Sequence, residues 1–537
     1  GKVRYVGEAI AAVAAESEDI AAEAVELINV EYKELSAIYD PEASASEHPA
    51  AILHPDLFKY KVAQRMPPNL DLNHPNVCNR VKVRKGDIEA GFKQAEFIVE
   101  NRFSTHLVHA VHMEPIAAVA RSENDGTITV WSPTQSVYRT RYMLSECLQM
   151  PQDRFRVIAT EIGGAFGNKL NAVQCEAVAA VVSVKTKRPV KVTLSREEVF
   201  TTTTTRHPFI IYIKDGVMKD GRIIARKLIA YLDGGAYSGG SGVSVARNAV
   251  FGSVNVYDIP NISIDNYRVY TSRVPAGAFR GYGTMQVCWA IESQMNLIAE
   301  TLGVNPVRVR QLNLISEGKP SAIGEKMYGQ TIDNCLKELL KIFDLNGREE
   351  AQHPWKIGKG IAISEKHSAE PGSCATIVYR YDGEIDVWVS VDEIGQGTQT
   401  GIAQIVAEEF RVPLSNIRVG KADTYLTPYD SGALSSRQLY NIGNAVILAC
   451  NDLKKNICET FSKRYGVPTE TLTVAGGKVS TRDGKEVEIS DLYVKGKSRY
   501  GVFLEKGGEF LGTGTWFVET GELDSETGMA TLPRINT

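Results

Sequence analysis

The chain of 537 residues is 43% hydrophobic and 23% charged, which is enough for several domains with buried cores. Its 60 Lys and Arg against 64 Asp and Glu leave a formal net charge of −4, so no positive field is expected that would gather nucleic acid. The longest apolar stretches, such as residues 177–182, fall far short of the roughly 20 residues that a membrane helix needs. These values exclude a single small module and argue against nucleic acid or a membrane as the main partner.

The cysteines are scattered along the chain, and no Cys-x-x-Cys occurs. Iron–sulfur and structural zinc sites usually take two or more ligands from one tight loop, so we expect neither centre on this chain. Most of the thiols are expected to be reduced and buried. The chain starts with Gly1-Lys2-Val3, without an initiator Met or a signal peptide, which predicts a processed or truncated start and a cytoplasmic location.

The N-terminal 45 residues predict a small β-α-β unit. Residues 3–15 have the composition of a strand, and Ser17 can cap a helix whose apolar positions, from Ile20 to Ile28, lie on one face. Six prolines then fall between positions 41 and 75. We therefore expect residues 46–75 to be a long linker on the surface and to mark a domain boundary.

Residues 76–317 predict a first large unit of mixed strands and helices. Strands are expected over residues 96–103, 116–120 and 127–131, the last two joined by a turn at Asn124-Asp125-Gly126. A helix should begin near Ser136. Another should cover residues 285–301 and stop at Gly303, since glycine often ends helices.

Residues 318–537 predict a second large unit of the same kind. A hairpin should turn at Asp382-Gly383, and a following helix should bury a face that runs from Ile402 to Phe410. A further helix is expected over residues 435–465. The fold class is therefore α+β, with mixed α/β elements in several domains.

Three glycine-rich loops stand where a strand is followed by a helix. The first, residues 161–169, follows a strand over 155–159; its glycines either allow backbone N–H groups to approach an anion or simply form a tight turn. The second, residues 274–283, sets Arg280 beside Phe279 and Tyr282, a cation and two rings suited to an oxyanion and a flat ligand. The third, residues 394–400, offers amide and hydroxyl donors at a helix start, although alone it is also typical of a polar turn.

Together these loops are similar to those of a known family. Gly-Gly-Ala-Phe-Gly, Ala-Phe-Arg-Gly-Tyr-Gly and Gly-Gln-Gly have the order and spacing of the xanthine oxidase and aldehyde oxidoreductase family of molybdenum hydroxylases. Supporting segments are residues 1–15, 112–115, 132–135 and 427–444, so the resemblance covers nearly the whole chain. It implies a partial hammerhead-like N-terminal domain followed by two molybdopterin-binding domains, the second incomplete at its C-terminus.

The resemblance also implies roles for individual residues. Gln135 and Arg280 would act beside the molybdenum as catalytic residues, and the metal would be held by pterin sulfurs without a protein ligand. The implied cofactor contacts are Gln135, Gly164, Ala165, Phe166, Gly167, Arg280, Gly395, Gln396, Gly397, Thr400, Ser435 and Ser436. The implied substrate contacts are Phe279, Tyr282, Leu170 and Asn248.

Members of this family insert water-derived oxygen into an electron-poor C–H bond, with a glutamate as general base. That glutamate belongs to a Gly-x-Gly-Glu segment that does not occur before Thr537, so we expect it outside this chain. Glu114, Glu161 and Glu393 stand in segments that have other counterparts, and we expect Glu114 and Glu161 to be structural carboxylates. On a strand, His109 would point away from His106 and His112, so no metal site is expected there.

Substrate and partners follow from the same resemblance. Leu170 stands where purine-oxidising members have a glutamate, and Arg247 and Asn248 straddle the place of an arginine, which disfavours a purine. An aromatic, heteroaromatic or aldehyde substrate is expected, with the cofactor as a cytosine dinucleotide and electrons leaving to 2Fe–2S and FAD centres on partner chains. Residues 427–432 are similar to hydroxybenzoyl-CoA reductases, so reductive dehydroxylation of an aromatic thioester is one alternative. The other is a cofactor-binding module that is inactive without a partner chain.

Overall fold

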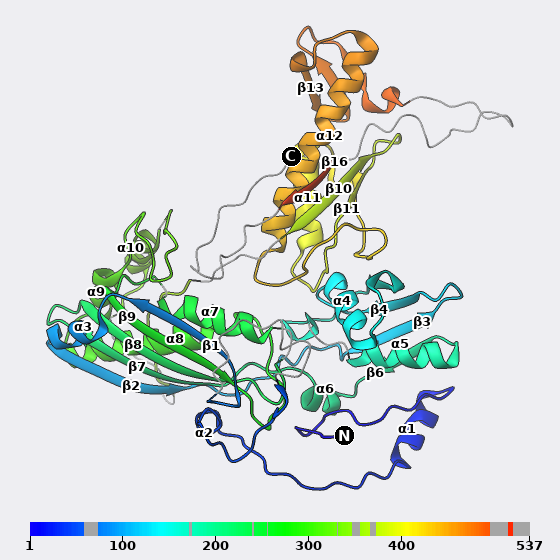
Figure 1. The fold of residues 1–537 in the computed structure, drawn as a ribbon. Helices are drawn as coiled ribbons and strands as arrows, with labels where there is room; N and C mark the ends of the chain where they lie inside the picture. Colours follow the sequence, from blue (N-terminus) through cyan, green and yellow to red (C-terminus); the bar gives the residue numbers. More distant parts are fainter. Residues whose placement is uncertain are drawn as a thin grey trace.

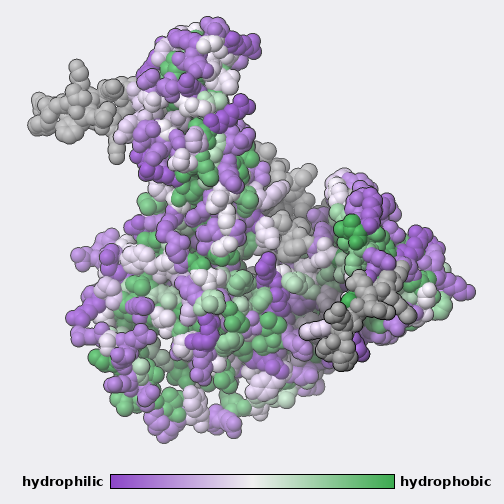
Figure 2. Space-filling model, turned by 180° about the vertical axis from the view of Figure 1, so that it is seen from behind, coloured by the Kyte–Doolittle hydropathy of each residue, from purple (hydrophilic) through white to green (hydrophobic). Residues whose placement is uncertain are grey.

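The computed structural model describes residues 1–57, 73–170, 174–238, 241–254, 256–329, 331–345, 355–365 and 372–493, and the backbone of strand β16 (Gly514–Val518). Helices and strands mix throughout, so the expected α+β class is confirmed (Figure 1). A broad lower part holds strands β1 to β9, and a narrower upper part holds β10 to β16 (Figure 1). Polar and apolar side chains alternate over the visible face (Figure 2).

The largest sheet of the lower part has the order β1-β9-β8-β7-β2. Its strands are β1 (Val77–Lys85), β2 (Phe97–Ser104), β7 (Phe209–Val217), β8 (Ile223–Asp233) and β9 (Asn261–Val269). Only β8 and β9 pair in parallel, through a crossover that contains helix α7 (Gly242–Val254). Helices α7 and α8 (Thr284–Leu302) bury their apolar residues against this sheet, while α3 (Ile88–Gln94) contacts β7, β8 and β9.

Local signals in this region behave as expected. Helix α8 ends at Gly303, which has the left-handed φ of 65° that glycine adopts without strain, and α9 (Pro306–Asn313) then begins with a proline in its first turn. Inside the sheet, Arg226 and Asp215 form a 2.8 Å ion pair with both side chains fully buried. A buried pair of this kind is tolerated because each charge satisfies the other.

A second sheet of the lower part has the order β5-β4-β3-β6 and carries the predicted hairpin. Its strands are β3 (Ala117–Ser122), β4 (Ile128–Ser132), β5 (Phe155–Ala159) and β6 (Val190–Thr193), with helices α4 (Val137–Leu148), α5 (Gln174–Thr186) and α6 (Arg196–Thr202) beside them. The β3–β4 turn closes with a 2.8 Å bond from the Glu123 N–H to the Thr127 carbonyl. Ser136 caps α4 as predicted, because its hydroxyl accepts from the Arg139 N–H.

The upper part is built on the sheet β12-β11-β10-β16. Strands β10 (Ser373–Tyr379) and β11 (Ile385–Trp388) form the hairpin expected at Asp382-Gly383, and β12 (Ile417–Val419) pairs with β11 in parallel. Helices α11 (Thr398–Phe410) and α12 (Gln438–Tyr465) cover it, and a small sheet of β13 (Leu472–Ala475), β14 (Lys478–Thr481) and β15 (Glu486–Glu488) lies at the far end of α12. Helix α10 (Ile332–Ile342) packs on the lower part. Short 3₁₀ turns occupy Gln152–Arg154, Asn168–Leu170, Leu414–Asn416, Thr469–Thr471 and Ile489–Leu492.

Helix α12 starts three residues later than predicted. Ser435 and Ser436 have φ angles of 50° and 55°, in the left-handed region, so neither belongs to a right-handed helix. The segment before α12 is therefore a loop. This difference matters because both serines are candidate cofactor contacts.

The predicted strand over residues 3–15 is wrong. Ser17 does cap helix α1 (Glu18–Glu26), but no strand occurs among residues 1–57. Gly7 takes a φ of 100° where it meets the Thr201 carbonyl, which breaks the extended run. A strand also needs a neighbour for its backbone groups, and no strand of the described part of the chain pairs with residues 3–15; Leu27, which follows α1, is 85% exposed.

The linker prediction also needs correction. Pro41 begins the short helix α2 (Pro41–Ser44), capped by Asp40, because proline fits the first turn of a helix. Further on, Leu53 and Leu57 are buried in a cluster with Tyr270. The segment is therefore packed against the lower part at Leu53 and Leu57, whereas most of residues 46–52 are exposed, and residues 58–72 of the expected linker lie outside the described ranges.

All eight cysteines are free thiols, and four of them are buried. Across the part of the chain that the structure describes, no helix is both long and apolar enough to cross a membrane.

Candidate functional site

One cavity of about 600 Å³ brings together the three glycine-rich loops. Its walls come from the lower part, through residues 135–282, and from the upper part, through residues 394–439. Eleven of the residues predicted to form the site line it: Gln135, Phe166, Gly167, Leu170, Phe279, Arg280, Tyr282, Gly395, Gln396, Ser435 and Ser436. Segments far apart in the sequence thus form one site.

The first and second loops are in direct backbone contact. The Arg280 N–H donates to the Phe166 carbonyl at 2.8 Å. Gly167 has a φ of 107°, and a Cβ added there would lie 2.7 Å from the Ala278 carbonyl oxygen. Only glycine therefore allows this approach. Phe166 itself has a φ of 55° and a side chain that is 42% exposed at the cavity.

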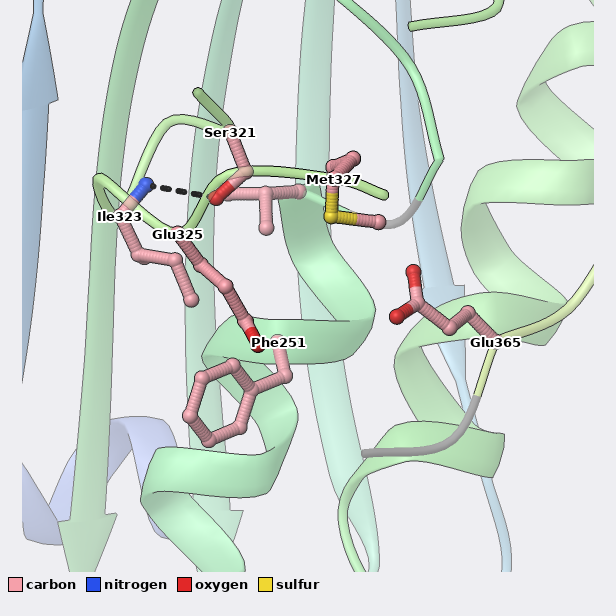
Figure 3. Close-up of a pocket in the computed structure, with 7 residues that line it drawn as sticks. Phe251, Ser321, Ile323, Glu325, Met327 and Glu365 are labelled. Carbon is pink, nitrogen blue, oxygen red and sulfur yellow. Dashed lines mark hydrogen bonds between the residues drawn. The ribbon is translucent and has the colours of Figure 1, made fainter. Parts of the chain in front are cut away.

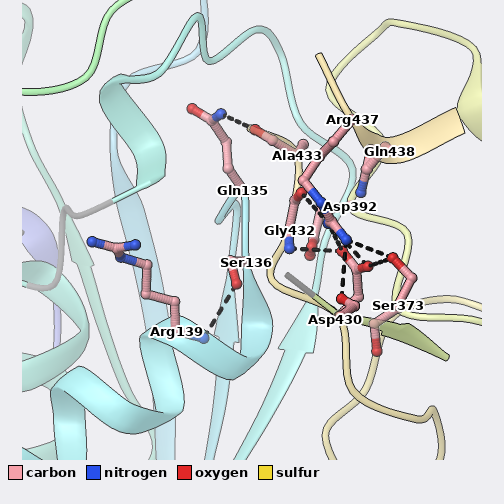
Figure 4. Close-up of polar contacts among 12 residues, drawn as sticks. Gln135, Ser136, Arg139, Ser373, Asp392, Asp430, Gly432, Ala433, Arg437 and Gln438 are labelled. Carbon is pink, nitrogen blue, oxygen red and sulfur yellow. Dashed lines mark hydrogen bonds and ion pairs between the residues drawn. The ribbon is translucent and has the colours of Figure 1, made fainter. Parts of the chain in front are cut away.

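The side chain of Gln135 joins the lower part to the upper part. Its amide oxygen accepts from the Gly167 N–H at 2.9 Å, and its amide nitrogen donates to the Ala433 carbonyl at 2.7 Å (Figure 4). The Ala433 N–H donates back to the Gln135 carbonyl at 2.7 Å. Tyr282 adds a second link, because its hydroxyl bonds to that of Ser435.

The third loop differs from the prediction in how its donors are used. The Glu393 carboxylate accepts from the N–H groups of Gly395 and Gly397, at 3.0 and 2.8 Å, and from Gln399. These amides at the start of α11 already have a partner within the chain. The Gln396 amide donates to Gln438 at 2.7 Å, so Gln396 lines the cavity in a fixed orientation.

Five predicted contacts are not among the residues that line the cavity, namely Gly164, Ala165, Gly397, Thr400 and Asn248. Thr398 takes the place expected for Thr400, because two residues along a helix lie on nearly opposite faces. Asn248 is buried in α7, where its amide donates to the Ser244 carbonyl at 2.8 Å. Gly164 and Ala165 shape the loop behind Phe166.

Several residues that line the cavity were not predicted from the sequence, among them Arg139, Ser241, Ser244, Ser431 and Arg437. Arg139 was within reach, since it lies one helical turn after Gln135 at the start of α4. Ser431 lies inside the segment 427–432 noted for its resemblance, whereas no motif marks Ser241 or Ser244.

The lining is rich in positive charge. It contains Arg139, Arg280 and Arg437, and none of the described residues that line it is Asp or Glu. Arg437 is neutralised by Asp430 in a fully buried pair at 2.9 Å, which also holds Ser373 (Figure 4). Arg280 makes no side-chain hydrogen bond or ion pair with any described residue. Its charge therefore faces the cavity.

Buried donors without partners mark the cavity floor. The Arg437 Nε and Gln438 Nε2 atoms are buried and bond to nothing in the described ranges. Beside them, burial and then the neighbouring Asp430 raise the pKa of Asp392 well above its ordinary value, which favours the neutral carboxyl group (Figure 4). Unpaired buried donors are costly unless a ligand or water accepts from them. A flat, anionic ligand rich in acceptors fits this set of donors.

The carboxylates that the sequence analysis assigned to structure have structural partners. Glu114 accepts from the Gly163 N–H at 2.7 Å and from the buried Lys169 ammonium at 2.5 Å. Glu161 pairs with Lys421 at the surface. Glu114 is thus hydrogen-bonded within the chain, as expected, whereas the Glu161 pair is exposed; that neither carboxylate acts as the base stays a prediction.

The histidine segment is not the strand that the sequence analysis assumed. Only Val108 forms an isolated bridge, to Arg206, while His109 bonds to the Thr203 hydroxyl at 2.8 Å. Burial lowers the pKa of His112 to about 4. No group of three metal-binding side chains is found among the described residues.

A second hollow is too small for a substrate. It is lined by Phe251, Ile323, Glu325, Met327 and Glu365 among others (Figure 3). Its volume of about 20 Å³ is close to what one water molecule needs.

Residues 71–314 and 336–531 match two molybdopterin cofactor-binding domains. The chain therefore belongs to the molybdopterin-binding large subunits of the xanthine oxidase and aldehyde oxidoreductase family, the molybdenum hydroxylases.

Two bacterial subunits of this family are similar to the chain over much of its length. The chain is 34% identical over 503 residues to the xanthine dehydrogenase molybdenum-binding subunit of Escherichia coli O157:H7, covering 91% of this chain and 64% of that protein. It is 34% identical over 354 residues to the nicotinate dehydrogenase large molybdopterin subunit of Eubacterium barkeri, covering 65% of this chain and 78% of that protein. The chain thus spans less than two thirds of the length of the E. coli relative.

Solved structures agree in fold. Quinoline 2-oxidoreductase from Pseudomonas putida 86 superposes with a TM-score of 0.79 at 23% identity, covering 91% of this chain and 63% of that chain. Aldehyde oxidoreductase from Desulfovibrio gigas superposes with a TM-score of 0.76 at 25% identity, covering 97% of this chain and 52% of that chain.

Gly167→Ala is expected to remove cofactor binding, because its Cβ would force the first and second loops apart. The matched control is Gly126→Ala, which carries a similar φ of 83° but whose Cβ would meet nothing closer than 3.6 Å. Both variants bear the strain of positive φ, roughly 1–3 kcal/mol. Pterin content, measured by fluorescence after release, should fall only in Gly167→Ala. Equal pterin content in the two variants would contradict the tight contact.

Glu176 lies beneath the segment that carries Gln135. It accepts a 2.6 Å bond from the Ser132 hydroxyl, three residues before Gln135, while its second oxygen is buried without a partner. Burial raises the pKa of Glu176 to about 7, against the opposing effect of the Ser132 hydroxyl. The carboxyl group is therefore protonated in the folded protein over a pH range in which it is ionised in the unfolded chain.

This shift predicts that stability falls as pH rises from about 5 to 8, because the unfolded chain binds fewer protons there. In the unchanged protein, this effect lowers the free energy of unfolding by up to roughly 3 kcal/mol over that pH range. In Glu176→Gln, whose side chain stays neutral, this decrease should be absent. Thermal unfolding midpoints across this range measure it. The surface variant Glu161→Gln should keep the original profile, and an unchanged profile in Glu176→Gln would count against a protonated Glu176.

Proposed function

We propose that this chain is the molybdopterin-binding subunit of a molybdenum hydroxylase-type oxidoreductase that acts on an aromatic, heteroaromatic or aldehyde substrate. The observation that carries the proposal is the convergence of Phe166, Arg280 and Gln396 on one cavity that has no carboxylate among its described lining residues. Family membership makes molybdenum–molybdopterin the expected ligand. Two molybdopterin-binding domains over residues 76–317 and 318–537, after a partial hammerhead-like domain over residues 1–45, are part of this proposal.

The residues present fit a flat cofactor that ends in phosphate. Gln135 and the backbone of Phe166 would face the metal end, while Gln396 and the hydroxyls of Ser435 and Ser436 would bind the pterin and its phosphate. Gly164, Ala165, Gly397 and Thr400 would support these contacts from behind the lining. The cytosine dinucleotide form is proposed for a bacterial enzyme.

The bound cofactor supplies a two-electron oxidation with oxygen derived from water. The protein's own contribution is orientation and charge. Arg280 presents its guanidinium to the cavity, where it stabilises negative charge that develops on the substrate. Gln135 is held by two hydrogen bonds, so its position does not change as charge develops. Proton abstraction is assigned to a glutamate outside this chain, in a further segment or subunit.

The substrate wall is apolar on one side and cationic on the other. Leu170 is buried in the wall and offers no hydrogen bond to a purine ring. Phe279 and Tyr282 provide flat surfaces, and Asn248 lies behind Ser244. The E. barkeri relative is named for nicotinate, a heteroaromatic carboxylate. An aromatic or heteroaromatic acid suits the arginines of this lining best, and the reductive direction on a thioester is the alternative.

Electrons must leave through other centres. We propose 2Fe–2S and FAD groups on partner chains or domains, in a cytoplasmic complex, since the chain has no Cys-x-x-Cys. The rival proposal is a cofactor-binding module without activity of its own. The cavity supports both proposals equally, because a cradle for the cofactor does not require turnover.

The test is to purify the chain with its co-purifying partners, measure molybdenum, and follow dye reduction with aromatic acids, N-heteroaromatics and aldehydes. We expect about one molybdenum per chain and turnover with at least one class. Molybdenum without turnover in the complete complex would favour the inactive module. No molybdenum or pterin under any expression condition would overturn the proposal.

Arg280→Ala should lower kcat by roughly 10²–10³, the usual cost of removing a group that stabilises transition-state charge. Molybdenum content should change less than twofold, on the order of normal preparation scatter, because the Arg280 backbone still bonds to Phe166. The control is Arg222→Ala, an exposed arginine in the lower part. If activity and molybdenum fall together in Arg280→Ala, the side chain is structural.

A further inference from the structure

Arg206 lies behind the cavity wall and contacts the second loop from outside. The centre of its guanidinium is 3.9 Å from the centroid of the Phe279 ring. Its Nη2 atom donates to the Arg280 carbonyl at 2.8 Å. Arg206 is not among the residues that line the cavity, yet it contacts Phe279 and Arg280, which do line it.

Among the residues that the structure describes, Arg206 has no ion-pair partner. Burial lowers the pKa of Arg206 to about 10, and no carboxylate acts against that shift. Its Nη1 atom is buried and bonds to nothing in the described ranges. Arg102, which lies over Tyr212, by contrast also pairs with Glu42. The charge of Arg206 is therefore directed at a ring face and a backbone carbonyl.

We propose that Arg206 is a positioning residue that holds Phe279 and the Arg280 backbone at the cavity wall. The inference rests on the proposed function, in which Arg280 acts on the substrate. The contact requires arginine, since a flat guanidinium can lie on the ring and donate sideways at the same time. An ammonium group of lysine has neither the plane nor the fork of donors.

The neighbouring backbone contacts do not depend on this side chain. The Thr205 N–H donates to the Pro275 carbonyl at 3.1 Å, and the Gly277 N–H donates to the Thr205 carbonyl at 2.9 Å. The first half of the second loop is thus tied to residues 204–206 through backbone alone. The second half, from Phe279 to Tyr282, is bonded to Phe166 through the Arg280 N–H, and Arg206 adds side-chain contacts to the Phe279 ring and the Arg280 carbonyl. A change at Arg206 should therefore separate the two halves.

The experiment is hydrogen–deuterium exchange on the full chain, comparing the unchanged protein with Arg206→Lys and Arg206→Met. Peptides that contain the Arg280 and Tyr282 amides should exchange on the order of tenfold faster in both variants, equivalent to about 1.4 kcal/mol. Peptides that end at Gly277 should be unchanged and serve as the internal control. Arg102→Met, which removes a comparable but exposed arginine–ring contact, should leave the loop unaffected.

Exchange needs no cofactor, so its outcome is separate from that of the proposed function. In the loaded complex both Arg206 variants should lower kcat by roughly 10- to 100-fold, with KM changed much less. Unchanged exchange at residues 279–282 would overturn the positioning role. Full rescue by Arg206→Lys would overturn it too, because charge alone would then suffice. Equal acceleration in both halves of the loop would make Arg206 a general structural residue.

Discussion

The side-chain amide of Gln135 is the interaction on which the cavity depends. One atom accepts from the first glycine-rich loop at Gly167, and the other donates to the upper part at Ala433. Both the oxygen and the nitrogen of the amide are therefore hydrogen-bonded. Because hydrogen bonds form only over a narrow range of distances, these two bonds fix the spacing between the lower and upper parts at this point. A residue with a single polar atom would make one of these contacts and leave the other group unpaired.

The backbone around Gln135 is held in conformations that an isolated peptide avoids. Phe166, Ser435 and Ser436 all have left-handed φ angles without being glycine. Such residues cost of order 1–3 kcal/mol each and persist where the surrounding contacts dictate them. Here the contacts are the bond from Arg280 to Phe166 and the bond between Tyr282 and Ser435. Strain at three points of one cavity is typical of a site prepared for a ligand.

The charged residues of the cavity also favour an anionic ligand. The described lining has arginines but no carboxylates, and its one fully buried ion pair, Asp430 with Arg437, is used to shape the loop before α12. Beside that pair, burial and the neighbouring Asp430 raise the pKa of Asp392 well above its ordinary value, which disfavours a negative charge there. Among the described residues, the Arg280 guanidinium has no hydrogen-bond or ion-pair partner, and the Arg206 side chain donates to the Arg280 backbone carbonyl from behind the wall. Arg437 thus has a structural role in its ion pair with Asp430, whereas the charge of Arg280 is available to a ligand in the cavity.

The sequence by itself determined the features that depend on neighbours along the chain. Ser136 caps its helix, Gly303 ends another, and the three motifs predict the loops that meet in the cavity. Only the tertiary structure decided which donors face the ligand and which are already engaged, as with the amide of Gly397, bonded to Glu393. It also decided that residues 3–15 form no strand, because strand formation requires a partner from elsewhere in the chain. Local signals act within a few residues, whereas burial, pairing and the direction of a side chain depend on contacts between distant segments.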